Sequence, residues 1–297
     1  MFKILISDKV DKSVLDQIKN PKISFDYRPE IIPEELVKNI SNYDGLVVRS
    51  RTKVTSEVIN RGHNLKVIAR VGSGLDNIDI VESKKRKITI VNSPESNSEA
   101  VTELAIGLIL SLLRKLPMAH SSMNQGLWLK KDLKGEEIEG KKIGVIGYGH
   151  IGKRMVKILT AFGAKVDYFS RSEKTNSLKY IFKHCDIITV HLPLNNNTRN
   201  LVNRDLLSLM KPTSYFINTS RGGVVEEKAI FKLLQEKKIS GAALDVFWQE
   251  PLPPTSPWRK LSNVVLTPHI AASTSEALKK GTKTVIDEVI KILVNKV

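Results

Sequence analysis

Short apolar runs separated by amphipathic segments recur along the whole chain. This alternation is typical of α/β proteins, in which helices cover the faces of parallel sheets. From residue 141 onward, consecutive apolar runs predict a doubly wound sheet. The expected strands cover residues 143–146, 166–169, 187–190, 214–218, 241–245 and 264–266.

The N-terminal third of the chain predicts a second sheet of the same kind. Its expected strands cover residues 2–7, 46–48, 65–70 and 88–91, with a helix at 11–19. A long helix is expected over residues 98–116, opened by Ser98 and ended by Pro117, and a final amphipathic helix over 275–294.

The segment KKIGVIGYGHIG, residues 141–152, carries the most specific motif of the chain. An apolar strand leads directly into Gly147-x-Gly149-x-x-Gly152, and a helix is expected over residues 153–162. Gly147 permits the tight turn, Gly149 allows a pyrophosphate to approach the backbone, and Gly152 allows the helix to pack closely on the strand. A helix N-terminus after such a turn favours anions, so the segment predicts a dinucleotide site.

This motif lies in the middle of the chain, which predicts an inserted domain. Crossings between domains are expected near residues 94–100 and 268–273. We therefore predict an α/β protein with two Rossmann-like domains. A dinucleotide-binding domain of residues 97–272 is inserted into a flavodoxin-like substrate domain of residues 1–96 and 273–297.

Composition excludes several classes of protein. The chain has 297 residues, a net charge of +16 and one cysteine, Cys185, which we interpret as a buried thiol in an apolar strand pattern. The lysines are scattered, so no nucleic-acid partner is expected. Apolar stretches are too short for a membrane span or a signal peptide, and no Cys/His spacing predicts a metal site. We expect a cytoplasmic protein.

The end of the second strand of the central sheet bears on the form of the cofactor. NAD-binding proteins usually carry an acidic residue there, which accepts hydrogen bonds from the ribose. This chain has Ser170 and Arg171, with Lys174 nearby, and Asp167 is expected to point elsewhere. Ser and Arg can donate to a 2′-phosphate, so NADP is preferred over NAD. In the alternative, Arg171 stacks on the adenine and either cofactor works.

Three polar residues follow expected strands of the central domain: Arg221, Glu250 and His269. Because ligands bind outside the carboxyl ends of the strands, these side chains can converge on a nicotinamide. Arg221 can hold a carboxylate and polarise a carbonyl, and His269 can exchange a proton with the carbonyl oxygen. Glu250 is expected to orient the imidazole of His269 and raise its pKa.

The chain resembles the D-2-hydroxyacid dehydrogenases, especially their D-3-phosphoglycerate dehydrogenase branch. The resemblance rests on VVRSRTKVTSEVI, ARVGSGLDNID, NSEAVTELAIGLIL, GVIGYGHIG, CDIITVHLPL, NTSRGGVVEE, GAALDVF-x-x-EP and TPHIAAST. It implies catalytic roles for Arg221, Glu250 and His269, an aspartate below the nicotinamide at Asp245, and a substrate-carboxylate loop at residues 71–74. It also implies a homodimer through the helix from Ser98 and the segment after it. The residues expected to face the cofactor are Gly147, Gly149, His150, Ile151, Gly152, Ser170, Arg171, His191, Pro193, Thr219 and Asp245.

The substrate is expected to be a small D-2-hydroxy acid or 2-oxo acid. Arginines at strand ends of the first domain suit the phosphate of D-3-phosphoglycerate, unless they serve packing or solubility. The expected substrate-binding residues are Arg49, Arg51, Arg70, Gly72, Ser73 and Gly74.

Two alternatives to this function remain. Ser170 and Arg171 favour an NADPH-dependent glyoxylate or hydroxypyruvate reductase. Certain corepressors also resemble these enzymes, but they carry extra tails that this chain does not show. The chain ends near residue 297, where longer phosphoglycerate dehydrogenases continue into regulatory domains, so feedback by serine through such a domain is not expected.

Overall fold

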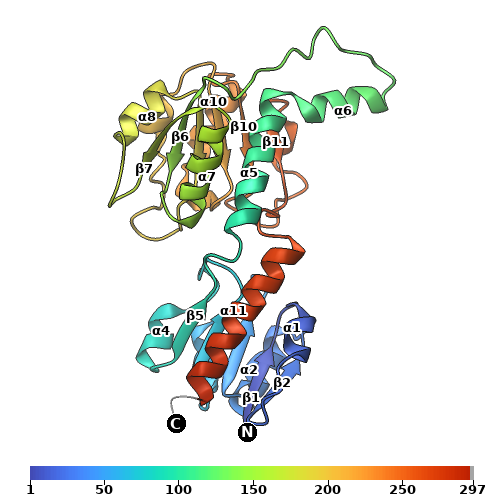
Figure 1. The fold of residues 1–297 in the computed structure, drawn as a ribbon, viewed down its shortest axis with the longest axis vertical. Helices are drawn as coiled ribbons and strands as arrows, with labels where there is room; N and C mark the ends of the chain where they lie inside the picture. Colours follow the sequence, from blue (N-terminus) through green and yellow to red (C-terminus); the bar gives the residue numbers. More distant parts are fainter. Residues whose placement is uncertain (295–297) are drawn as a thin grey trace. The chain divides into compact units, whose positions relative to one another are not determined.

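A computed structural model describes residues 1–294. The chain divides into two compact units (Figure 1). The central unit comprises Ser98–Ala271, and the terminal unit comprises Met1–Asn97 together with the segment from Ala272 onward. Both units are parallel sheets covered by helices, so the expected α/β fold is confirmed.

The terminal unit holds a parallel sheet in the order β2-β1-β3-β4-β5, which is the flavodoxin-like order. Its strands are β1 (Phe2–Ile6), β2 (Ile23–Tyr27), β3 (Gly45–Val48), β4 (Val67–Arg70) and β5 (Thr89–Asn92). Its helices are α1 (Lys12–Asp16), α2 (Pro33–Asn39), α3 (Ser56–Arg61), α4 (Ile80–Lys85) and α11 (Ser275–Val294). α11 packs on β4 and β5 and buries Val285, Ile286 and Val289 against one face of the sheet.

The central unit holds a parallel sheet in the order β11-β10-β9-β8-β6-β7. Its strands are β6 (Lys142–Ile146), β7 (Lys165–Phe169), β8 (Ile187–Val190), β9 (Tyr215–Asn218), β10 (Gly241–Leu244) and β11 (Val264–Leu266). Its helices are α5 (Ser98–Leu113), α6 (Leu116–Asn124), α7 (His150–Ala161), α8 (Leu178–His184), α9 (Arg204–Leu207) and α10 (Glu227–Gln235). Since β6 lies between β7 and β8, the crossovers change direction there, and ligands of such sheets bind at this point.

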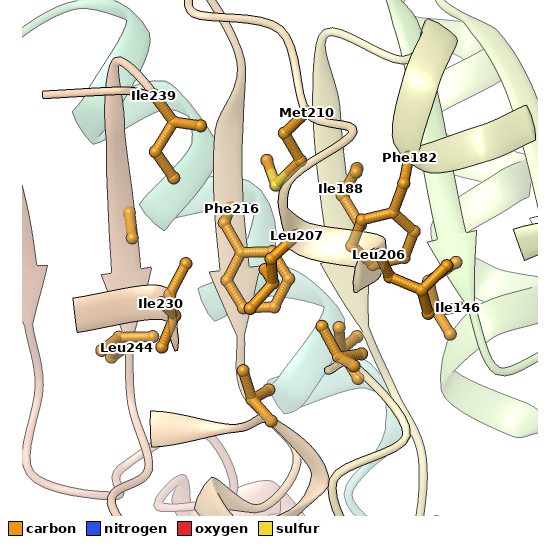
Figure 2. Packing of buried hydrophobic residues seen from close by; sticks show 14 of the residues in the cluster. Ile146, Phe182, Ile188, Leu206, Leu207, Met210, Phe216, Ile230, Ile239 and Leu244 are labelled. Carbon is orange, nitrogen blue, oxygen red and sulfur yellow. The ribbon is translucent and has the colours of Figure 1, made fainter. Parts of the chain in front are cut away.

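Each face of the central sheet carries its own apolar core. α5 and α7 cover one face, where Ile109, Met155 and Leu159 are buried against the strands. Figure 2 shows the other face, where Phe182, Leu206, Leu207, Phe216 and Ile230 belong to one buried apolar cluster. Both faces are covered, which explains why the strands are continuous apolar runs in the sequence.

Some expected element bounds are wrong. The helix predicted over residues 98–116 ends at Leu113, because Lys115 adopts a left-handed conformation with φ 52°. Pro117 does not end a helix but stands in the first turn of α6, where its missing N–H costs nothing. The helix of the glycine motif begins at His150 rather than at residue 153. Cys185 caps the end of α8 instead of lying in a strand, and burial raises the pKa of its thiol to about 12.

Candidate functional site

The glycine turn joins β6 to α7 in the way that the motif predicts. Gly147 has φ 104°, and its N–H donates to the carbonyl of Phe169 at 2.8 Å. A Cβ on Gly152 would lie 1.9 Å from the carbonyl oxygen of Gly147, whereas a Cβ on Gly149 would meet nothing within 4 Å. Gly149 is the N-cap of α7 and makes no side-chain cap hydrogen bond, so the N-terminus of this helix is suited to an anion.

Two buried polar atoms at the ends of neighbouring strands have no hydrogen-bond partner within residues 1–294. They are Nδ1 of His191, after β8, and Oγ1 of Thr219, after β9. Nε2 of His191 lies 2.9 Å from Oγ1 of Thr189, and burial lowers the pKa of His191 to about 3, so this ring is neutral. Unpaired buried polar atoms are costly, and a ligand group is a common partner for them. The glycine turn and these two atoms together fit a dinucleotide cofactor.

The turn after β7 is closed by the hydroxyl of Ser170. This hydroxyl accepts from the N–H of Glu173 at 3.0 Å and donates to the carbonyl of Glu173 at 2.7 Å. Asp167, the nearest strand acid, accepts from Thr175 and Asn176. Arg171 is exposed at the tip of the turn. The turn therefore carries an exposed guanidinium, and the carboxylate of Asp167 is engaged by Thr175 and Asn176, which follow the turn.

His269 and Glu250 form the charged pair of the site. Nδ1 of His269 lies 2.7 Å from Oε2 of Glu250, and Oε1 accepts from the N–H of Phe247 at 2.9 Å. Burial raises the pKa of Glu250, but the hydrogen bonds from His269 and Phe247 and the charge of Arg221 outweigh it, so the net shift is downward. Glu250 is thus ionised at neutral pH and can only accept. Nδ1 of His269 therefore carries a proton, and Nε2 remains for chemistry.

Asp245 holds the loop that carries His269. Its carboxylate is fully buried and accepts from Oγ1 of Thr267 at 2.6 Å and from the N–H groups of Ile270 and Ala271 at 2.9 Å each. Its carbonyl accepts from the N–H of His269 at 2.8 Å. His269 has φ 54°, a left-handed conformation that non-glycine residues rarely adopt. These bonds stabilise that conformation.

The loop of Arg221 packs directly against the loop of Glu250. A Cβ on Gly222 would lie 2.3 Å from the carbonyl of Phe247, so only glycine allows this approach. Nη1 of Arg221 donates to the carbonyl of Ser220 at 2.7 Å. The charge of Arg221 contributes to the lowered pKa of Glu250. The structure thus brings Arg221, Glu250 and His269 together.

Asn218 is a supporting residue that the sequence did not single out. Its buried side chain accepts from the N–H and hydroxyl of Ser220 and donates to the carbonyl of Arg221 at 3.0 Å. The only signal in the sequence was an asparagine at the end of an apolar strand. Pro193 lies in the loop after β8, where its carbonyl accepts from Thr198. His150 and Ile151 form the first turn of α7.

The terminal unit carries the residues expected to bind the acid. The guanidinium of Arg70 lies over the loop of residues 71–74, with Nη1 2.6 Å from where a Cβ on Gly72 would stand. The N–H groups of Val71 and Gly72 are taken by Val48 and Ser93. Of the four N–H groups in the loop, those of Ser73 and Gly74 are therefore the ones that can receive an anion.

Arg49 and Arg51 are both engaged inside the terminal unit. Arg51 donates to Asp8, to the carbonyl of Ile31 and to the carbonyl of Ser7. Nη1 of Arg49 donates to the carbonyl of Lys9 at 3.2 Å. Arg51 thus has a packing role, which was the alternative to phosphate binding.

Other kinds of site find no support in residues 1–294. The described part of the chain contains no group of three or more side chains that could hold a metal ion. None of its helices has the length and apolar composition needed to cross a lipid bilayer.

The fold and the site define a dinucleotide-binding oxidoreductase of the α/β class. Residues 106–271 match the model of the D-isomer specific 2-hydroxyacid dehydrogenase, NAD binding domain. The chain is 38% identical to hydroxypyruvate reductase of Thermotoga maritima, over 98% of each chain. The chain belongs to the D-isomer specific 2-hydroxyacid dehydrogenase family.

Other similar proteins differ in substrate and length. The chain is 39% identical to D-3-phosphoglycerate dehydrogenase of Methanocaldococcus jannaschii, covering 99% of this chain and 58% of that protein. It thus spans little more than half the length of that relative. A solved acyclic imino acid reductase in complex with NADPH and D-Arg superposes with a TM-score of 0.91 and 31% identity, covering 99% of this chain and 98% of that one.

Proposed function

We propose that this protein is a nicotinamide-dependent D-2-hydroxyacid dehydrogenase that oxidises D-3-phosphoglycerate to 3-phosphohydroxypyruvate. The observation that carries the proposal is the 2.7 Å contact between His269 and Glu250, with Arg221 packed beside them in a unit that has a dinucleotide turn. The central unit binds the cofactor, and each unit carries residues that contact the acid. The single buried cysteine suits a reducing cytoplasm, where we place the protein.

The residues act as an acid–base pair with an anion clamp. The bound nicotinamide supplies the acceptor of the hydride that leaves C2 of the hydroxy acid. Nε2 of His269 takes the hydroxyl proton, while Glu250 holds Nδ1 and stabilises the imidazolium that forms. Arg221 holds the carboxylate and polarises the C2 oxygen. In the reverse direction, Nε2 returns the proton.

Phosphate recognition is the part of the proposal that selects the substrate. Arg70 lies beside Gly72 of the 71–74 loop, whose N–H groups at Ser73 and Gly74 can receive the carboxylate of the acid. Arg49 stands at the end of the neighbouring strand β3. Guanidinium groups at strand ends suit phosphate and carboxylate oxygens.

A second candidate is the NADPH-dependent reduction of glyoxylate or hydroxypyruvate. It is favoured by the absence of a carboxylate at Ser170 and by the exposed Arg171, which can pair with a 2′-phosphate. The 38% identity to hydroxypyruvate reductase of Thermotoga maritima also supports it. We propose NADP as the preferred cofactor for either substrate.

Initial rates with D-3-phosphoglycerate, glyoxylate and hydroxypyruvate, each with both cofactor forms, test these proposals. We expect kcat/KM to be highest for the phosphorylated acid and at least tenfold higher with the NADP pair than with the NAD pair. No turnover of D-3-phosphoglycerate alongside rapid reduction of glyoxylate would replace the first candidate by the second. A strong preference for NADH would overturn the cofactor assignment.

We propose that the protein is a homodimer through α6 and the segment after it. Large apolar side chains are exposed there: Leu116, Met118, Met123, Leu127 and Trp128, of which Trp128 is 76% exposed. An exposed cluster of this kind marks a protein interface. Light scattering should give twice the chain mass of 33.3 kDa, and Trp128→Asp should shift the equilibrium to the monomer. A monomeric wild-type protein at micromolar concentration would contradict the proposal.

A further inference from the structure

Asn77 bridges two strand-end segments of the terminal unit. Its Nδ2 donates to the carbonyl of Arg49 at 2.7 Å and to the carbonyl of Thr52 at 2.6 Å, and its Oδ1 accepts from Nε of Arg70 at 3.2 Å. Only one orientation of the carboxamide fits. Rotated by 180°, its oxygen would face two carbonyls and its nitrogen would face a guanidinium. The side chain is therefore a fixed bridge.

The backbone around Asn77 is held as firmly as its side chain. Its carbonyl accepts from the N–H of Val54 at 2.8 Å, and the N–H of Asp79 donates to the carbonyl of Val54 at 2.9 Å. Val54 and Ile78 form a parallel bridge. Because this backbone is fixed, the bonds of the carboxamide hold Arg70 in one place relative to residues 49–52.

Asp8 holds residues 49–52 from the other side. It is 2% exposed and accepts from the N–H groups of Arg49 and Thr52, from Oγ1 of Thr52 at 2.7 Å and from Nε of Arg51 at 3.1 Å. A buried carboxylate with this many hydrogen-bond donors orders the segment around it. The 49–52 segment is thus a rigid base for Asn77.

These contacts lie at the carboxyl ends of the strands of the terminal unit, at the point where open α/β sheets bind ligands. In the order β2-β1-β3-β4-β5, the crossovers change direction between β1 and β3. Asp8 follows β1, Arg49 follows β3, and Arg70 ends β4. Ligands of open α/β sheets bind outside the carboxyl ends of strands at such a point.

We propose that Asn77 is a positioning residue, which fixes the guanidinium of Arg70 beside Gly72 of the 71–74 loop and so sets the affinity for the anionic acid. The inference rests on the proposed function, because it assumes that this unit binds the acid. It also explains why an amide is needed at this position. A carboxylate of the same shape would pair with Arg70 but would face the carbonyls of Arg49 and Thr52 with no proton to donate.

The test compares Asn77→Asp with the wild-type protein. We expect KM for the acid to rise at least tenfold, with kcat changed less than threefold and the Kd for NADPH changed less than twofold. Calorimetric binding of oxalate, a non-reducible dianion, should weaken in parallel. Asn64→Asp is the matched control. Asn64 is exposed in the same unit and donates to the carbonyl of Ser41 at 2.8 Å, so its replacement should leave all four values unchanged.

Arg70→Lys provides a second route if Asn77→Asp folds poorly. It keeps the positive charge but removes the Nε that Asn77 holds, so it should reproduce the loss of oxalate affinity. The double variant should lose no more than twofold beyond the larger single loss, because both changes break one interaction. Losses of oxalate affinity that multiply in the double variant would overturn the proposal. So would single variants that lose thermal stability but keep the wild-type KM and oxalate affinity. Absence of turnover in the wild-type protein would refute the proposed function instead. The affinities of the wild-type and Asn77→Asp proteins for oxalate would still test the role of Asn77.

Discussion

Replacing His269 by alanine is expected to lower kcat at least about 100-fold, the lower end of the effect of a positioned proton donor. The reason is geometric: Glu250 occupies Nδ1, which leaves Nε2 as the atom that can exchange a proton with the C2 oxygen. Since the side chain of His269 is 40% exposed, its removal opens no core cavity. The measurement is kcat at neutral pH together with the melting temperature, which should move little.

His63→Ala is the control for this prediction. His63 is exposed in the terminal unit and makes no side-chain hydrogen bond with residues 1–294, so its removal should leave kcat within twofold. A His269→Ala protein that kept a tenth or more of the wild-type kcat would show that another group transfers the proton. In that case the pair with Glu250 would be structural.

Gly152→Ala is expected to lower the stability of the fold, whereas Gly149→Ala is expected to lower the affinity for the cofactor. A Cβ at Gly152 would lie 1.9 Å from the carbonyl oxygen of Gly147, so β6 and α7 must move apart. Overpacking of this kind costs roughly 1–3 kcal/mol of stability. A Cβ at Gly149 meets no protein atom within 4 Å, and this residue has φ −84°, so Gly149→Ala should fold as stably as the wild-type protein.

The two variants separate cofactor binding from folding. Gly149→Ala should weaken the binding of NADPH at least tenfold, because the methyl group occupies the space through which a pyrophosphate approaches the N-terminus of α7. Urea unfolding and the fluorescence of bound NADPH measure the two effects. Unchanged NADPH affinity in Gly149→Ala would mean that the cofactor does not bind over this turn. Unchanged stability in Gly152→Ala would mean that the packing of α7 on β6 is not tight.

The strands were readable from the sequence where both faces of a sheet are covered. Such strands are continuous apolar runs, and those of the central unit were predicted to within two residues of their observed ends. β2 was missed because polar residues alternate with apolar ones in Ile23–Tyr27, so this edge strand is not a continuous apolar run. The end of α5 was missed because a proline stops a helix interior but is tolerated in a first turn, and only the backbone at Lys115 distinguishes the two cases.

The residues of the candidate site could be predicted where their types and spacing together suit few roles other than binding or catalysis. Three glycines at fixed spacing between a strand and a helix, combined with a histidine and an acid after later strands, together indicate particular chemistry. Supporting residues carry no such signal. Asn77, Asn218 and Asp8 are ordinary polar residues in the sequence, and their importance comes from partners 2 to 44 residues away. Pairings over that distance depend on how strands are ordered in a sheet.

The sequence by itself therefore determined the α/β class and the dinucleotide turn, and it singled out His269 and Glu250, which lie 2.7 Å apart in the structure. Tertiary structure decided which polar groups are still available to a ligand. Arg51, which is expected to bind substrate, donates three hydrogen bonds within its own unit. The N–H of Gly72 donates to the hydroxyl of Ser93. The physical reason is that a hydrogen-bonding group can be recognised from its residue type, but whether it is already occupied depends on neighbours that only the folded chain brings within 3 Å.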